Sequence, residues 1–115
     1  NLVLHPVKIT PANLNAIFKE ADLLIEALDE ADQKEMLISC WLSNYPKKHI
    51  IAASGIAGFG KNENIYGEHY GFLHIVGDMK SELKPEISPI ATRVAVVANM
   101  QANLALELIA KAKGI

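Results

Sequence analysis

Two short apolar runs with a helical segment between them constrain the fold of this chain more than any other feature. Residues 22–28, DLLIEAL, and residues 49–54, HIIAAS, are each typical of a buried strand. The residues between them predict a helix over 31–45, which Pro46 stops. A strand, a helix and a second strand in this order favour a parallel sheet with right-handed crossovers. We therefore predict a fold of the α/β class.

The remaining segments extend this alternation. Thr10 is a preferred N-cap residue and Pro11 suits the first position of a helix, so a short helix is predicted to begin there. Pro6 lies within the apolar run before it, which indicates an edge strand or a bulge. In chain order, the further elements are a strand at residues 2–9, a helix ending near Ala21, a strand at 70–76, a polar loop at 79–87 and a helix from Ser88 to about Lys113.

The predicted last helix is apolar on nearly all of its sides from residue 90 to residue 109. A helix of this kind is normally buried on several faces. Polar and charged residues interrupt it too often for a membrane span, among them Arg93, Gln101 and Glu107. In a chain this small, so much apolar helix suggests a homodimer interface or a missing partner half.

The composition is that of an ordinary globular domain. With 115 residues, half of them hydrophobic, the chain has about the size of one domain. Its net charge of −2 offers no basic surface to nucleic acid. The single Cys40, beside Trp41, is predicted to be a buried inert thiol and allows no internal disulfide. A cytoplasmic setting fits this cysteine usage, and no signal peptide is visible.

The strand at 22–28 delivers one acid, Asp29, to the point where the next helix begins. Open α/β sheets place their chemistry at the carboxyl ends of strands. Asp29 therefore has two interpretations. It can hold a magnesium ion, or it can cap the helix, because aspartate is a preferred N-cap residue. Most aspartates in this position are caps.

Two further patterns fall short of a site. Residues 55–62, GIAGFGKN, come close to the phosphate-binding pattern G-x-x-x-x-G-K-[ST], but Asn62 stands where Ser or Thr is needed and no helical pattern follows. A glycine-rich turn between strands is the simpler interpretation. His69 and His74 are five residues apart, so in one extended strand they would point to opposite faces and would not share a metal ion. His5 has no second ligand nearby.

Three blocks of the sequence resemble the carboxyl-terminal half of the ThiF/MoeB family, bacterial relatives of the ubiquitin-activating enzymes. They are ADLLIEALDEADQKEML, IIAASGIAGFGKN, and LHIVGD followed by PIATRVAVVANMQANLALELI. The likeness is greatest to the subgroup that adenylates the sulfur carrier ThiS in thiamine biosynthesis, and it extends from Leu2 to about Lys113. The resemblance implies a Rossmann-like three-layer αβα fold with a mixed sheet, of which residues 1–115 would be the carboxyl-terminal half.

The resemblance also implies an activity. The family uses Mg-ATP to adenylate the C-terminal Gly-Gly of a small ubiquitin-like sulfur carrier, with release of pyrophosphate. Asp29 matches the family's magnesium-binding aspartate, which implies a catalytic, metal-binding and cofactor-binding role. Lys34 falls where the family carries a basic residue, which implies contact with ATP; on the residues alone it is equally a solvated helix charge. By the same resemblance, the turn at 55–62 and the loop at 78–88 would border the channel for the carrier's tail.

The chain departs from the family pattern in several respects. The G-x-G-x-x-G turn, the ribose-binding acid and the basic phosphate contacts lie upstream in the family, and none is present here, so we expect residues 1–115 alone to be inactive. The loop at 78–88 has no cysteine for sulfur transfer, and no CxxC pair predicts zinc. The chain begins with Asn1, which suggests a fragment of a longer protein. The alternative function is a non-catalytic module that binds a partner through its apolar surface.

Overall fold

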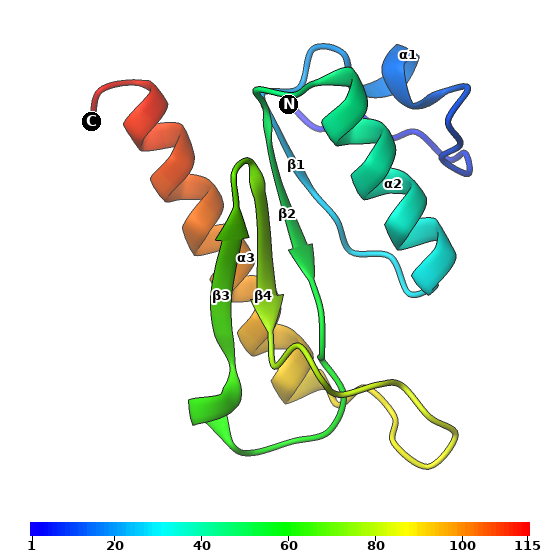
Figure 1. Ribbon diagram of the computed structural model, residues 1–115, viewed down its shortest axis with the longest axis vertical. Coiled ribbons are helices and arrows are strands. Elements are labelled where there is room, and N and C mark those ends of the chain that lie inside the picture. Colours follow the sequence, from blue (N-terminus) through cyan, green and yellow to red (C-terminus); the bar gives the residue numbers. More distant parts are fainter.

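The computed structural model describes all residues from Asn1 to Ile115. It contains four strands and three α-helices, with one short 3₁₀ helix (Figure 1). In chain order the elements are α1 (Leu14–Phe18), β1 (Leu23–Ile25), α2 (Ala31–Asn44), β2 (His49–Ala53), η1 (Asn62–Asn64), β3 (Tyr66–Tyr70), β4 (Leu73–Gly77) and α3 (Ala91–Ala112).

The four strands form one mixed sheet in the order β1-β2-β4-β3. β1 and β2 are parallel, and so are β2 and β4. β3 pairs with β4 in the antiparallel sense and forms one edge of the sheet. The predicted α/β class is confirmed, and the sheet is mixed, as the resemblance implies, rather than wholly parallel as the alternation of elements favours.

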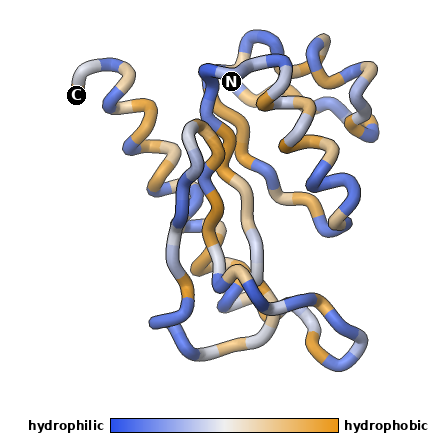
Figure 2. Tube along the Cα trace, in the orientation of Figure 1, coloured by the Kyte–Doolittle hydropathy of each residue, from blue (hydrophilic) through white to orange (hydrophobic).

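Alternating residues of the central strands supply two separate cores. Ile50 packs with Leu24 of β1 and with Leu37 and Trp41 of α2, beside Leu14. Its neighbour Ile51 belongs to a second cluster, because successive residues of a strand point to opposite faces. The members of that cluster are Ile51, Ala53, Val76, Val97 and Ala105. α1 and α2 therefore cover one face of the sheet and α3 covers the other (Figure 1), and hydrophobic positions follow β2 and β4 (Figure 2).

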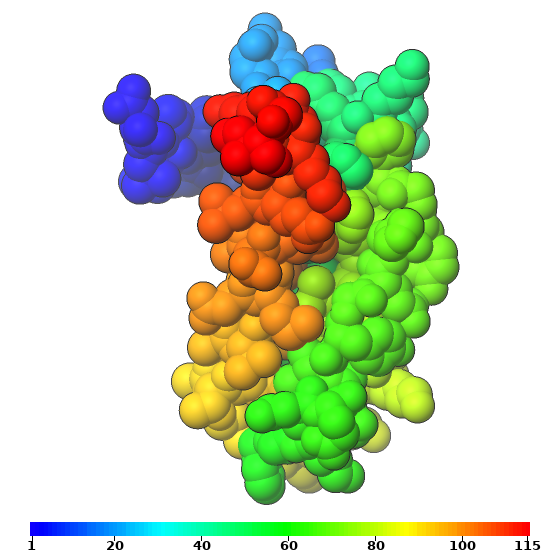
Figure 3. Space-filling model, turned by 90° about the vertical axis from the view of Figure 1, so that its left-hand side faces the viewer, coloured from blue at the N-terminus to red at the C-terminus, as the bar shows by residue number.

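The amino-terminal segment differs from its prediction. Residues 2–9 form no strand. The backbone turns at Pro6, where the Val7 amide bonds the His5 carbonyl at 2.8 Å. Leu2, Val3 and Leu4 are 71 % to 84 % exposed. The space-filling view shows this segment standing out from the body of the protein (Figure 3). Its apolar pattern was insufficient for a strand because a strand also needs a neighbour, and no β-strand lies beside it here.

The first helix also begins later than predicted. Thr10 does not cap it; the N-cap residue is Asn13, and helical residues start at Leu14. Thr10 and Asn13 instead bond each other, with the Thr10 amide donating to Asn13 Oδ1 at 2.8 Å and the Asn13 amide donating to Thr10 Oγ1 at 3.3 Å. Short polar side chains of this kind compete with helical hydrogen bonding.

A β-hairpin replaces the single strand predicted at 70–76. Tyr66–Tyr70 forms β3, and Gly71 at φ +61° allows the turn into β4. His69 and His74 are directly opposite each other in the ladder. The prediction that these two side chains point to opposite faces is therefore wrong, because it assumed that one extended strand contained both.

The last helix buries one stripe rather than several faces. Its buried residues, Arg93, Val97, Gln101 and Ala105, recur every four positions. Leu106 is 68 % exposed, and Val96 and Ile109 are also exposed. The predicted burial on several faces is therefore wrong for this chain. None of the helices combines the length and the hydropathy that a bilayer crossing requires.

Candidate functional site

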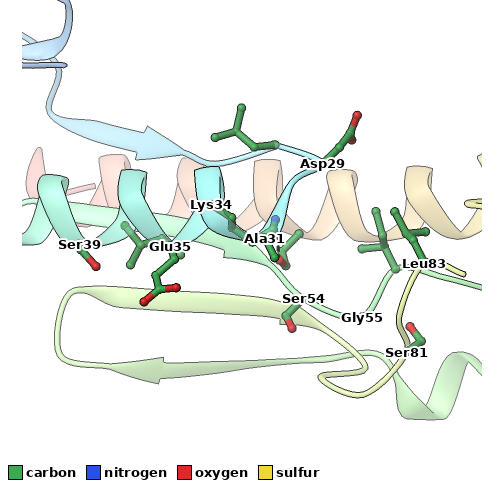
Figure 4. A pocket seen from close by; sticks show the side chains of 13 residues that line it. Asp29, Ala31, Lys34, Glu35, Ser39, Ser54, Gly55, Ser81 and Leu83 are labelled. Carbon is green, nitrogen blue, oxygen red and sulfur yellow. Dashed lines mark hydrogen bonds between the residues drawn. The ribbon is translucent and has the colours of Figure 1, made fainter. Parts of the chain in front are cut away.

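The carboxyl ends of the three parallel strands lie at one edge of the sheet, and a cleft opens there. Its volume is about 430 Å³. One wall is the start of α2 together with the residues that follow β1, and the other is formed by the segments that follow β2 and β4 (Figure 4). The polar side chains that line the cleft are those of Asp29, Lys34, Glu35, Ser39, Ser54 and Ser81.

Asp29 lies at the rim of this cleft and is exposed. It follows β1 and precedes Glu30, which is the N-cap residue of α2. The side chain of Glu30 forms no cap hydrogen bond, and Asp29 has no hydrogen bond to the first turn of the helix. Asp29 is therefore not a helix cap, and its carboxylate is available to a ligand from solvent.

Lys34 is in the same cleft, but its ammonium group is already bound. Nζ lies 2.8 Å from both carboxylate oxygens of Glu26 and 3.1 Å from the carbonyl oxygen of Ala53. These contacts occupy the donor capacity of a lysine. The interpretation of Lys34 as a solvated helix charge is wrong. It fastens the first turns of α2 to the ends of β1 and β2.

Glu26 is the residue that the sequence reasoning missed. Its side chain is wholly buried, and it accepts hydrogen bonds from the amides of Leu28 at 2.6 Å and Ala53 at 3.4 Å in addition to the Lys34 ammonium. A buried carboxylate needs this kind of complete pairing. The available signal was a single acid within an otherwise apolar run, eight residues before a lysine.

Gln101 of α3 reaches the same strand ends from the opposite face. Its side-chain amide donates to the carbonyl oxygens of Glu26 at 3.2 Å and Ile51 at 3.3 Å. Gln101 is itself buried. Side chains from both faces of the sheet, Lys34 of α2 and Gln101 of α3, therefore bond Glu26, the residue that follows β1.

Asp78 organises the segment after β4. Its Oδ1 accepts hydrogen bonds from the amides of Lys80 at 2.9 Å and Ser81 at 2.7 Å, and its Oδ2 lies 3.1 Å from the guanidinium of Arg93. Burial raises the pKa of Asp78, but the bonds from Ser81 and Lys80 and the charge of Arg93 outweigh burial and lower the pKa below its ordinary value. The carboxylate is therefore ionised at neutral pH. Arg93 and Asp78 also line a second, open cavity of about 890 Å³.

The glycine-rich segment after β2 is not a phosphate-binding loop. Residues 55–62 lead into η1 and β3, and no α-helix follows them. Without a helix, the loop lacks the aligned amides that bind phosphate. The segment is a connection between strands, as predicted.

The donor set at the cleft suits one particular kind of metal binding. No group of three or more His, Cys, Asp or Glu side chains is arranged to hold a metal ion. Mg²⁺ is usually bound by one or two carboxylates together with substrate phosphates, and it needs no cage built only from protein. The exposed carboxylate of Asp29 fits that pattern.

No protein-family model, curated protein or solved structure matches the chain.

Proposed function

We propose that residues 1–115 form the carboxyl-terminal half of a ThiF/MoeB-type adenylyltransferase with a Rossmann-like three-layer fold. The complete cytoplasmic enzyme would use Mg-ATP to adenylate the C-terminal Gly-Gly of a ThiS-like sulfur carrier in thiamine biosynthesis. One observation carries this proposal. The three sequence blocks that resemble the family meet at a single edge of the sheet and are joined there by hydrogen bonds.

The contacts between the blocks are specific. The first block contributes Glu26 and Lys34, which bond the backbone of Ala53 in the second block. The third block contributes Gln101, which bonds the backbone of Glu26. The Asp78 amide, also of the third block, bonds the Gly55 carbonyl at 3.1 Å. The three blocks therefore meet at the edge of the sheet where the cleft opens.

The charges at the cleft favour a cation. Lys34 is neutralised by Glu26, whereas Asp29 and Glu35 have no basic partner among the hydrogen bonds and ion pairs of the structure. A triphosphate would therefore enter this half of the site together with its magnesium ion. Asp29 would hold that ion, which neutralises charge on the phosphates when it is bound.

This assignment changes the expected role of Lys34. Direct contact with ATP would require its ammonium to leave a wholly buried carboxylate, which is costly. We therefore assign Lys34 a positioning role: it holds α2 and the strand ends so that Asp29 remains at the rim. The residues that bind the nucleotide itself would come from the upstream half of the enzyme, and the exposed apolar positions of α3 would contribute to a homodimer.

Replacing Asp29 by alanine is expected to lower ATP–pyrophosphate exchange at least about 100-fold, because the transition state loses its electrostatic support. The assay compares the longest natural version of the protein with its Asp29→Ala variant in the presence of a ThiS-type carrier. Asp32→Ala is the matched control, because Asp32 is an exposed acid of the same helix that does not line the cleft. Near-normal exchange by Asp29→Ala would refute the assignment.

A binding module without catalysis is the second candidate, and the exposed apolar segment at Leu2, Val3 and Leu4 favours it. The same assay separates the two functions. Exchange by the longer protein but not by the 115-residue chain supports the enzyme. Absence of exchange from both, with the carrier still bound, supports the module.

A further inference from the structure

Three of the four histidines of this chain lie in a row across adjacent strands, on the face of the sheet that α3 covers. They are His49 of β2, His74 of β4 and His69 of β3. The ring centroids of His49 and His74 are 5.0 Å apart, and those of His74 and His69 are 5.8 Å apart. His74, in the middle of the row, is 9 % exposed. No function proposed above uses these side chains.

One hydrogen bond joins His49 and His74. His49 Nδ1 lies 2.9 Å from His74 Nε2, so one of these nitrogens donates and the other accepts. If both imidazoles were protonated, two N–H groups would face each other across that distance and both would be donors. Two positive charges would also lie side by side at a site from which solvent is largely excluded.

The groups that face His74 offer little compensation. They are His49 from β2, His69 from β3 and Glu107 from α3, and only Glu107 is acidic. Glu107 is exposed and is already paired with Lys111, whose Nζ lies 2.6 Å from its carboxylate. On the other side of the row, the ring of Phe72 packs against His49 at 4.7 Å between centroids. An added proton in this row therefore lacks a free counter-ion.

We infer that His49, His69 and His74 form a proton-sensitive latch that fastens the β3–β4 hairpin to β2 beneath α3 at neutral pH and loosens in acid. The latch is independent of the adenylyltransferase proposal, because none of its residues lines the cleft.

The direction of the effect follows from burial. Burial lowers the pKa of His49 below its ordinary value of 6.5, and it lowers the pKa of His74 in the same way, with a further decrease from the charges of His49 and His69. Below pH 6.5 the unfolded chain therefore binds more protons than the folded one. The contribution of the row to stability is complete above about pH 6.5 and is lost as the pH falls through the folded pKa values.

Native-state hydrogen exchange of the β4 amides tests the latch. After correction for intrinsic rates, we expect their opening equilibrium to rise at least about tenfold between about pH 7.5 and about pH 5.5 in the full chain. In His74→Gln the rise should be at most about threefold, because the glutamine amide does not titrate. The fourth histidine supplies the control: His5 lies outside the row in the amino-terminal segment, so His5→Gln should respond as the unmodified protein does.

Two results would overturn the latch. One is the same pH response in His74→Gln as in His5→Gln. The other is protonation of the row, followed by the imidazole resonances of the unmodified protein, without any change in β4 exchange. If His74→Gln does not fold, His49→Gln, which removes the other ring of the hydrogen-bonded pair, and the imidazole titration give the same decision.

Discussion

Lys34→Met is expected to lower the free energy of unfolding by about 3–5 kcal/mol. The substitution keeps much of the length of the side chain but removes the counter-ion of Glu26, whose carboxylate is wholly buried. It also removes the bond to the Ala53 carbonyl, so the start of α2 loses its connection to β2. Urea denaturation followed by circular dichroism measures the loss. If the unfolding free energy depends on urea concentration with the same slope in both proteins, the variant exposes the same surface on unfolding.

Two variants show whether the charge is responsible. In Glu26→Leu/Lys34→Met both partners are apolar, so part of the lost stability should return, since a buried ion pair is often replaceable by hydrophobic residues. The recovery is incomplete because the amides of Leu28 and Ala53 lose the carboxylate that they bond. Lys111→Met breaks the exposed pair with Glu107 and should leave the denaturation midpoint within measurement error. The interpretation fails if Lys34→Met resembles Lys111→Met, or if the double variant is no more stable than the single one.

The Lys34–Glu26 pair also determines whether Lys34 could bind phosphate at the cleft. If Lys34 is needed mainly for stability, its loss in the adenylyltransferase proposed above should reduce activity in proportion to the folded fraction and should leave the KM for ATP nearly unchanged. If Lys34 instead bound phosphate, its loss would raise the KM for ATP in a protein that remains folded. The structure favours the first outcome, because all three bonds of the ammonium are made within the protein.

The elements with strong local signals were predicted well. The helix predicted over 31–45 matches α2, because Pro46 cannot continue a helix and the residues before it carry no breaker. The strand predicted at 49–54 matches β2, since a continuous run of β-branched and small apolar residues suits a strand buried on both faces. In both cases the information lies within the segment itself.

The features that were missed depend on partners far away in the sequence. Residues 2–9 have an apolar pattern but no neighbouring strand, so pattern alone predicted the wrong element. The hairpin of β3 and β4 was overlooked because β3 is mostly exposed and carries no apolar run, and the register that brings His69 to His74 follows only once the turn at Gly71 is known. The wholly buried Glu26 has its ammonium partner eight residues away and receives a backbone bond from β2, which no local pattern describes.

Gly77→Ala is expected to destabilise the protein by about 3–5 kcal/mol. A Cβ atom at this position would lie 1.7 Å from the carbonyl oxygen of Ser54, and Gly77 has φ +146°, a conformation that L residues rarely adopt. The Ser54 backbone cannot move aside easily. Its amide bonds the Val76 carbonyl at 2.9 Å, and its carbonyl accepts a bond from the Met79 amide at 3.2 Å.

Two other glycines separate the steric clash from the cost of a positive φ. Gly71 also has a positive φ, +61°, but a Cβ atom added there would meet no atom within 4 Å, so Gly71→Ala should cost only about 1 kcal/mol for the backbone conformation. Gly67 lies in β3 without a positive φ, and a Cβ atom there would have its nearest contact 3.9 Å away, so Gly67→Ala should be nearly neutral. If Gly77→Ala loses no more stability than Gly71→Ala, the ends of β2 and β4 are not held together as tightly as the structure indicates. In that case Ser54 and Ser81 would not form a fixed wall, and the cleft beside Asp29 would have to be formed by its ligand.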